Sequence, residues 1–278
     1  MIKLIASDLD GTLLNRFHVT DWFILNTIDK VIEKDIHFVI ATGRSMQKNQ
    51  FSEIFGKRKL YRIINNGSII VSPYNEVIYE QLIDKQFIED TLNRFPDQPF
   101  DFVSFETTYI NTSKKRYLKE FEAERQYVNR KLLKSLAKFF VGNKYDVPKE
   151  EILTKNIVKI NCRFTDIKVL QEFKEHLSQY PNIVNNPFSD VMFELTHHTA
   201  NKANALKFLL EKLNIDKEHV VVFGDGNNDI ELLSEFKNSY APKNATQEAK
   251  IAATHMIGYN KYYSVPRKIR QLIRKVGK

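Results

Sequence analysis

IKLIASDLDGT, residues 2–12, is the stretch of this chain that decides the fold. Its first part, residues 2–6, is mostly apolar and stops abruptly at acidic residues and a glycine, which is typical of a buried parallel strand. Asp8 and Asp10 stand two residues apart, so on an extended chain their side chains point to the same side, and Gly11 allows the backbone to turn sharply away. The stretch therefore predicts a strand that ends in two neighbouring carboxylates.

The same alternation of strands and helices continues on both sides of the middle of the chain. Further short apolar runs, each ending in polar residues or glycine, predict strands at 37–41, 61–64 and 219–223. Apolar residues at helical spacing predict helices at 21–33, 45–55, 202–213, 229–236, 244–253 and 265–276. Strands that alternate with helices in this way indicate an α/β fold with an open, doubly wound and mostly parallel sheet.

The middle of the chain shows a different order of strand and helix patterns. It begins with a β-hairpin, in which residues 68–72 and 76–80 flank the turn-forming cluster PYN. Beyond it, strand patterns at 100–105, 108–111, 157–164 and 191–195 are interleaved with helix patterns at 132–140 and 167–180. This indicates an inserted α+β domain at residues 84–195, and a core domain made of residues 1–83 and 196–278.

Composition limits the class of protein. A chain of 278 residues with 42% hydrophobic residues can bury a substantial core, which argues against global disorder. The formal charge of +8 predicts attraction to anions, whether phosphorylated metabolites, nucleic acid or an acidic membrane surface, and charge alone does not choose among them. Cys162, the single cysteine, lies in an alternating strand pattern and is expected to be a buried core thiol.

The sequence gives no indication of a membrane protein. No apolar run approaches the roughly 20 residues that span a bilayer. The N-terminal segment reaches Asp8 and Asp10 too soon for a signal peptide. We therefore expect a soluble, cytoplasmic protein.

Three polar clusters follow predicted strands. DLDGT at 8–12 follows the first strand, TGR at 42–44 the second, and GDGNND at 224–229 the late one. Because ligands bind beyond the carboxyl ends of the strands in a doubly wound sheet, these clusters are expected to converge on one crevice. Three or four carboxylates that meet there repel one another unless a hard cation lies between them, so the arrangement predicts Mg²⁺ with oxygen ligands.

The clusters suit phosphoryl transfer. One of the paired carboxylates can attack phosphorus while the other donates a proton to the departing oxygen and later takes one from water. The phosphoryl oxygens need neutralising donors, and Thr42, Lys202 and Asn228 have that chemistry. Each motif alone can also be explained without catalysis. Asp-x-Asp is common in turns, and Arg44 or a lysine near the start of a helix can be a solvated surface charge. Their joint order favours the catalytic reading.

In this order and spacing the chain resembles the haloacid dehalogenase superfamily of phosphohydrolases, in the Cof-type branch with a large IIB-type α/β cap after the second motif. DLDGT at 8–12 is similar to the first family motif, Thr42-Gly43 to the second, Lys202 to the third, and GDGNND at 224–229 to the fourth. The resemblance spans nearly the whole chain. It implies a Rossmann-like core and a mobile cap, residues 84–195, that closes over the site and selects the substrate.

The resemblance also implies a role for each matching residue. Asp8 becomes phosphorylated, and Asp10 is the general acid and base. The implied Mg²⁺ ligands are Asp8, the backbone carbonyl of Asp10, and Asp225, with Asp229 as a further ligand or a support for them. The residues implied to bind the phosphate or the rest of the substrate are Thr42, Arg44, Lys202, Asn228 and the backbone amides of Leu9 and Gly43.

Two segments depart from the family pattern. Ala203 follows Lys202 where relatives often have glycine, and YNKYY at 259–263 stands in place of an acidic segment. The second departure concerns the outer rim of the site. Other conspicuous residues have structural readings, as surface residues of a hinge or as exposed faces of amphipathic helices: His197, His198, and the basic residues of 109–127 and 265–276.

The leading prediction is a Mg²⁺-dependent phosphatase that hydrolyses small phosphorylated metabolites through an aspartyl-phosphate intermediate. Sugar phosphates, phosphorylated cofactors and nucleotides all stay open as substrates. A phosphosugar mutase is an alternative, because the same intermediate can pass its phosphoryl group to a sugar hydroxyl. A nucleic-acid-binding protein with a vestigial site is disfavoured, because the acidic residues repel phosphates unless metal is bound, so no nucleic-acid partner is expected.

Overall fold

The computed structural model describes residues 1–45, 48–123, 142–185 and 191–274. The chain forms two compact units, one made of residues 1–80 and 200–278 and the other of residues 81–199. The helix expected at 132–140 and the last two residues of the helix expected at 265–276 lie outside the described ranges. Within those ranges, no helix is both long enough and apolar enough to cross a membrane.

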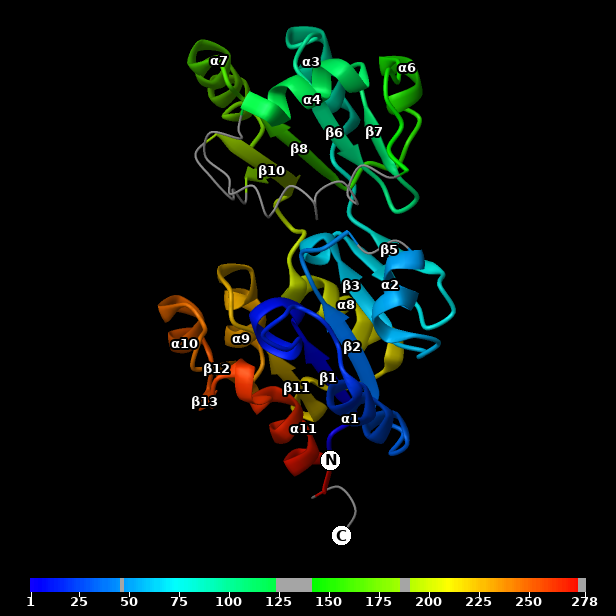
Figure 1. The fold of residues 1–278 in the computed structure, drawn as a ribbon, viewed down its shortest axis with the longest axis vertical. Helices are drawn as coiled ribbons and strands as arrows, with labels where there is room; N and C mark the ends of the chain where they lie inside the picture. Colours follow the sequence, from blue (N-terminus) through cyan, green and yellow to red (C-terminus); the bar gives the residue numbers. More distant parts are fainter. Residues whose placement is uncertain (46–47, 124–141, 186–190, 275–278) are drawn as a thin grey trace. The chain divides into compact units, whose positions relative to one another are not determined.

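The first unit, which we call the core unit, is built on an eight-stranded sheet in the order β13-β12-β11-β1-β2-β3-β4-β5 (Figure 1). From β13 to β3 neighbouring strands run parallel, and β4 and β5 extend the sheet as an antiparallel hairpin. The chain winds outward from β1 in both directions, which confirms the doubly wound α/β fold. The strands are β1 (Leu4–Ser7), β2 (His37–Ala41), β3 (Tyr61–Ile64), β4 (Ile69–Val71), β5 (Val77–Glu80), β11 (Val220–Phe223), β12 (Ser239–Pro242) and β13 (His255–Ile257).

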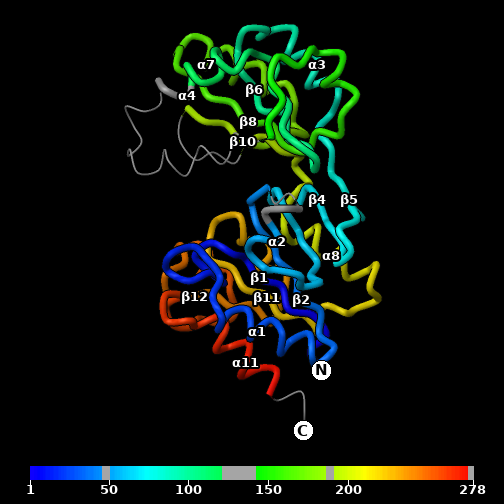
Figure 2. Tube along the Cα trace, turned by 45° about the vertical axis from the view of Figure 1, so that its right-hand side comes forward, coloured from blue at the N-terminus to red at the C-terminus, as the bar shows by residue number. Residues whose placement is uncertain are grey.

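Helices cover both faces of the core sheet, as Figures 1 and 2 show. Leu4 and Ala6 of β1 pack with Leu206 of the helix α8 in one buried cluster, whereas α1 packs against α11 and β2. Side chains of Asp21 and Asn201 cap the N-termini of α1 and α8 by accepting backbone N–H bonds. The helices are α1 (Trp22–Ile32), α2 (Lys48–Phe55), α8 (Lys202–Leu213), α9 (Ile230–Glu235), α10 (Gln247–Ala252) and α11 (Ser264–Arg274).

The second unit, which we call the inserted unit, has a five-stranded antiparallel sheet in the order β7-β6-β8-β10-β9. This α+β arrangement is the one that the sequence predicts for the middle of the chain. Its strands are β6 (Phe100–Val103), β7 (Thr108–Ile110), β8 (Lys159–Arg163), β9 (Ile183–Asn185) and β10 (Met192–His197). Its helices are α3 (Lys85–Arg94), α4 (Lys114–Ala123), α6 (Lys149–Ile152) and α7 (Ile167–Leu177).

The strands of the inserted unit alternate between an apolar and a polar set of side chains. Phe102 and Cys162 belong to the apolar core shared with α3 and α7, so Cys162 is a buried thiol, as its pattern predicts. At the alternate strand positions, which form the polar set, the strands carry buried charged side chains. One of these is Lys159, whose ammonium lies 3.2 Å from the Glu194 carboxylate. Tyr117 of α4 donates its hydroxyl proton to Asp101 across 3.1 Å. Within this set Lys159 is paired with Glu194, and Tyr117 with Asp101.

His176 of α7 is a buried titratable group in the apolar core of the inserted unit. Its ring stacks on Phe87, 5.7 Å between centroids, and shares a hydrogen bond of 3.0 Å with the hydroxyl of Thr91. Burial and the nearby charge of Arg94 lower the pKa of His176 below its ordinary value of 6.5. The folded chain therefore favours the neutral ring.

We predict that stability falls as pH decreases through about 6.5, because the unfolded chain then binds a proton at His176 that the folded chain excludes until its lower pKa is reached. His176→Gln removes this contribution. Urea unfolding between about pH 7.5 and 5.5 should show a larger loss of stability for the wild type than for the variant. His198→Gln, at an exposed position of the same unit, should keep the wild-type dependence. Equal pH dependence of the wild type and His176→Gln would contradict the prediction.

Candidate active site

Three acidic side chains meet at the carboxyl end of the parallel sheet. Asp8 follows β1 and Asp225 follows the neighbouring parallel strand β11. Asp229 lies on the 3₁₀ turn that comes next, and its Oδ2 accepts backbone N–H bonds from Asp225 and Gly226, at 2.9 and 3.0 Å. One carboxylate oxygen from each of the three aspartates lies within 4.8 Å of the others. The topology therefore gathers distant parts of the chain into one acidic cluster.

A buried lysine joins two of these carboxylates. The Lys202 ammonium donates hydrogen bonds to Oδ1 of Asp8 and to Oδ1 of Asp229, both at 2.7 Å. Lys202 is 1% exposed, and Asp229 is completely buried. Because Lys202 is the first residue of α8, next to the Asn201 cap, the start of that helix directs the lysine into the cluster.

The cluster holds more negative charge than one lysine compensates. Burial raises the pKa of Asp8 to about 8, against the charge of Lys202 and with the help of the neighbouring carboxylates. Burial also raises the pKa of Asp225 to about 6, against a hydrogen bond from Thr12. Burial disfavours the Lys202 ammonium, but its two carboxylate partners outweigh this and raise the pKa of Lys202 above its usual range. A further cation would relieve the repulsion among the carboxylates.

The arrangement of oxygens fits a hard divalent cation. Mg²⁺ binds oxygen ligands at about 2.0–2.1 Å in octahedral geometry, so ligand oxygens lie about 3–4 Å apart around it. The three oxygens of the cluster, within 4.8 Å of one another, approach that spacing. Asp8, Asp225 and Asp229 are therefore the side chains that could hold the ion. The backbone carbonyl of Asp10, expected as a further ligand, stays a prediction.

The Asp10 side chain has other partners. Arg44 donates two hydrogen bonds to it, from Nε to Oδ2 at 2.7 Å and from an Nη to Oδ1 at 2.5 Å. Nδ1 of His18 lies 3.0 Å from the same Oδ1. Burial alone would raise the pKa of Asp10, but the hydrogen bonds and charges of Arg44 and His18 outweigh it and hold the pKa below its usual value. Asp10 is therefore a carboxylate in this state, and the structure brings Arg44 to Asp10.

A second group of predicted residues is joined through Asn66. Thr42 is buried at the end of β2, and its carbonyl accepts the backbone N–H of Asn66 at 3.1 Å. The Asn66 side-chain oxygen accepts a hydrogen bond of 2.9 Å from the Asn228 amide. A side chain on Gly43 would place its Cβ 2.6 Å from that oxygen. Glycine therefore lets the loop after β2 approach the loop after β11.

Two glycines permit the close packing on which the acidic cluster depends. Gly11 has φ of 79°, and a Cβ there would lie 2.0 Å from Oδ2 of Asp225. Gly67 has φ of 104°, and a Cβ there would lie 2.2 Å from the backbone oxygen of Asn201, the residue that caps α8. Both positions need the left-handed backbone that glycine adopts without steric cost. The turn predicted at Gly11 is confirmed.

Three polar residues of the site were not predicted from the sequence. Thr12 lies inside the DLDGT motif, and its hydroxyl donates to Asp225 at 2.5 Å. Asn66 lies in the turn NNG at 65–67, and this sequence was the readable signal, since asparagine tolerates the positive φ that Asn66 adopts, 57°. His18 comes from the irregular loop before α1, where no periodicity places a side chain.

Comparisons of the sequence with known proteins find a matching family and a similar protein over nearly the whole chain. A sequence model of the haloacid dehalogenase-like hydrolase family matches residues 5–269. Phosphatase YwpJ of Bacillus subtilis (strain 168) is 26% identical over 289 residues, which covers 98% of this chain and 100% of YwpJ.

Two solved structures share the fold of the chain. A haloacid dehalogenase-like hydrolase from B. subtilis has a TM-score of 0.75 at 24% identity, covering 98% of this chain and 100% of that one. TM0651 from Thermotoga maritima has a TM-score of 0.79 at 23% identity, covering 98% of this chain and 97% of that one. At these identities the likeness concerns the fold alone.

We predict that Lys202→Met lowers the free energy of unfolding by about 3–5 kcal/mol at neutral pH, because it leaves buried carboxylates without their cation. The loss should shrink as pH falls from about 8 to 5, since the charge of Lys202 also lowers the pKa of Asp225, and its removal raises that pKa above about 6, so that protonation of Asp225 in the folded variant then removes part of the repulsion. Urea unfolding at the two pH values measures both effects.

Lys207→Met is the matched control. Lys207 lies on the same helix, partly exposed, with its ammonium 3.7 Å from Glu235. Its replacement should change stability by less than about 1 kcal/mol, as for other surface ion pairs. A Lys202→Met protein as stable as this control would refute the assignment of Lys202 as the counter-ion of the cluster.

Proposed function

The chain belongs to the haloacid dehalogenase-like hydrolases, and from this premise we propose that it is a Mg²⁺-dependent phosphatase of small phosphorylated metabolites, with Asp8 as nucleophile. The single observation that carries the proposal is the buried contact of Asp8 with Lys202 inside a cluster of three carboxylates. The name of the relative YwpJ, a phosphatase, supports the reaction class.

We assign the chemical steps to Asp8 and Asp10. An oxygen of Asp8 attacks phosphorus while the bond from phosphorus to the departing oxygen breaks, and that oxygen takes a proton from Asp10. Water then gives a proton to Asp10 and attacks the same phosphorus, which releases inorganic phosphate and restores the Asp8 carboxylate. When bound, Mg²⁺ supplies positive charge that neutralises the phosphoryl oxygens.

The proposed acid role requires a change at Asp10. In the state described, Arg44 and His18 hold Asp10 as a carboxylate, which can take a proton but has none to give. Asp10 can be protonated only after the guanidinium of Arg44 leaves it. A phosphate is the natural second partner for Arg44, because guanidinium groups bind phosphate and carboxylate with the same two-pronged geometry. Substrate binding and activation of Asp10 are thereby coupled in the proposal.

The phosphate is assigned to donors around Asp8. An ammonium has three N–H bonds, and Lys202 uses two of them on Asp8 and Asp229, which leaves one for a phosphoryl oxygen. The Thr42 hydroxyl and the Asn228 amide lie on the loops after β2 and β11, which meet through Asn66. The backbone amides of Leu9 and Gly43 complete the proposed set.

Substrate choice is assigned to the inserted unit, expected from the sequence at residues 84–195 as a cap. Sugar phosphates, phosphorylated cofactors and nucleotides are the candidate substrates. The mutase and nucleic-acid-binding alternatives gain no support from the relatives. Product analysis separates hydrolysis, which yields free phosphate, from a mutase reaction, which yields an isomerised phosphosugar.

Asp8→Asn should lower Mg²⁺-dependent release of phosphate from p-nitrophenyl phosphate by at least about a thousandfold, because an amide is a poor nucleophile. A colorimetric assay on purified protein measures the rate. Asp216→Asn, at an exposed position, should keep wild-type activity. Near wild-type turnover by Asp8→Asn in a clean preparation would exclude Asp8 as nucleophile.

Mg²⁺ should stabilise the folded protein, by about 2–3 kcal/mol at a hundred times its dissociation constant. Asp225→Asn should lose most of this stabilisation, because it removes one proposed ligand. Thermal unfolding with Mg²⁺ or with a chelator measures the effect. Asp35→Asn, on an exposed turn, serves as the control. If Asp225→Asn responded to Mg²⁺ as the control does, the ion would have to bind elsewhere.

A further inference from the structure

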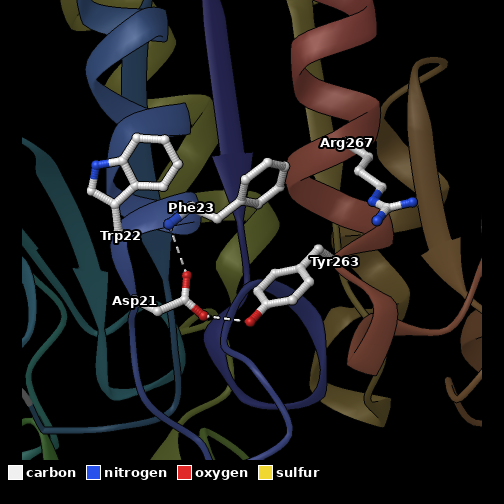
Figure 3. A pocket seen from close by; sticks show the side chains of 5 residues that line it. All are labelled: Asp21, Trp22, Phe23, Tyr263 and Arg267. Carbon is white, nitrogen blue, oxygen red and sulfur yellow. Dashed lines mark hydrogen bonds between the residues drawn. The ribbon is translucent and has the colours of Figure 1, made fainter.

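A hollow of about 370 Å³ opens on the core unit where α1 begins beside the start of α11. Figure 3 shows its lining, which consists of Asp21, Trp22, Phe23, Tyr263 and Arg267. The hollow is open to solvent and is not an enclosed cavity. None of these residues belongs to the acidic cluster, so the hollow is a separate feature of the core unit.

Asp21 forms the polar floor of the hollow, and its hydrogen bonds are already made. Its Oδ1 accepts the backbone N–H groups of Phe23 and Ile24, at 3.0 and 3.1 Å. Its Oδ2 accepts from the Tyr263 hydroxyl at 2.7 Å and from the Asn15 amide at 3.1 Å. The carboxylate also lies at the positive end of α1. The acceptor oxygens of Asp21 are therefore occupied by donors of the protein itself. Its bond to the Tyr263 hydroxyl fixes that side of the hollow.

The walls of the hollow present aromatic faces to solvent. Trp22, the one tryptophan of the chain, is 74% exposed. Tyr263 packs edge-on against Phe23, 5.4 Å between ring centroids, and has a positive φ of 58°, which is unusual for a bulky residue. The hydrogen bond from its hydroxyl to Asp21 fixes the position of the Tyr263 ring. Tyr263 and the exposed indole of Trp22 both line the hollow, and aromatic faces of this kind are suited to stacking on a planar group.

Arg267 contributes a positive charge to the hollow. It lies one turn after Tyr263 on α11 and is exposed. Arg270, on the same helix, shows the contrast, because its guanidinium donates to Thr27 and Asn26 and lies over the Phe23 ring. Among the described residues no carboxylate lies within ion-pair distance of Arg267. The hollow thus combines aromatic faces with a cation that has no carboxylate partner in the part of the chain that the structure describes.

We propose that this hollow binds a small planar anion, that is, an aromatic ring carrying a phosphate or carboxylate group. The ring stacks against Trp22 and Tyr263, and the anionic group pairs with the Arg267 guanidinium. Stacking and a charge-assisted bond act together, so a ligand needs both parts. This ligand class follows from the residues that line the hollow and does not depend on the function of the acidic cluster.

The single tryptophan makes the test specific, because emission excited at about 295 nm reports on Trp22 alone, the other aromatic rings absorbing little there. The full chain is titrated with AMP in the presence of a chelator, which removes divalent metal from the acidic cluster. We expect saturable quenching of Trp22 emission. Adenosine, which lacks the anion, and ribose 5-phosphate, which lacks the ring, should each bind about tenfold more weakly or not at all.

Arg267→Gln should weaken the AMP-induced quenching about tenfold, the worth of one charge-assisted bond. Arg274→Gln is the matched control, because it removes the same charge from the same face of α11 two turns further on and should bind AMP as the wild type does. Equal thermal unfolding of the two variants shows that both are folded. Absence of quenching, equal quenching by ribose 5-phosphate or adenosine, or wild-type binding by Arg267→Gln would each overturn the proposal.

Discussion

The buried contact of Lys202 with Asp8 and Asp229 is the interaction on which the rest of the site depends. Two carboxylates at that depth would repel each other and be driven toward their protonated forms without the ammonium. The contact also joins the beginning of the chain to its last third. It therefore requires β1, β11 and the start of α8 to be in place together, which ties the local geometry of the site to completion of the whole sheet.

The topology explains why the acidic cluster forms at this edge of the sheet. The chain winds away from β1 on both sides, so the loops after β1 and β11 leave the sheet in the same direction next to each other. Close approach of these loops is possible because Gly11 has no side chain to clash with Asp225. A parallel sheet and one glycine thus account for a convergence of charge that neither motif could create alone.

The sequence predicted those parts of the fold and of the site that have a regular apolar pattern or a recognisable motif. The strands that precede Asp8 and Asp225 were predicted because their apolar runs end in recognisable acidic motifs, and the doubly wound core followed from their alternation with helices. The strands β9, β12 and β13 were missed, because their sequences, IVN, SYAP and HMI, contain neither a longer apolar run nor a recognisable motif at the strand end. The contacts of Asp10 with Arg44 and His18 were missed for another reason. They depend on how two loops fold against each other, which periodicity does not describe.

The net charge of +8 does not by itself say which cations can bind a partner, so the surroundings of each cation must be considered. Lys202 neutralises the acidic cluster, Arg44 is bound to Asp10, and Arg58 forms an ion pair of 2.7 Å with Asp29 at the surface. Such cations serve the fold or the site and offer little to a partner. Arg267 differs, because it stands beside exposed aromatic rings with no carboxylate partner among the described residues. One of the excess charges thus lies in the hollow that we propose as a site for a planar anion.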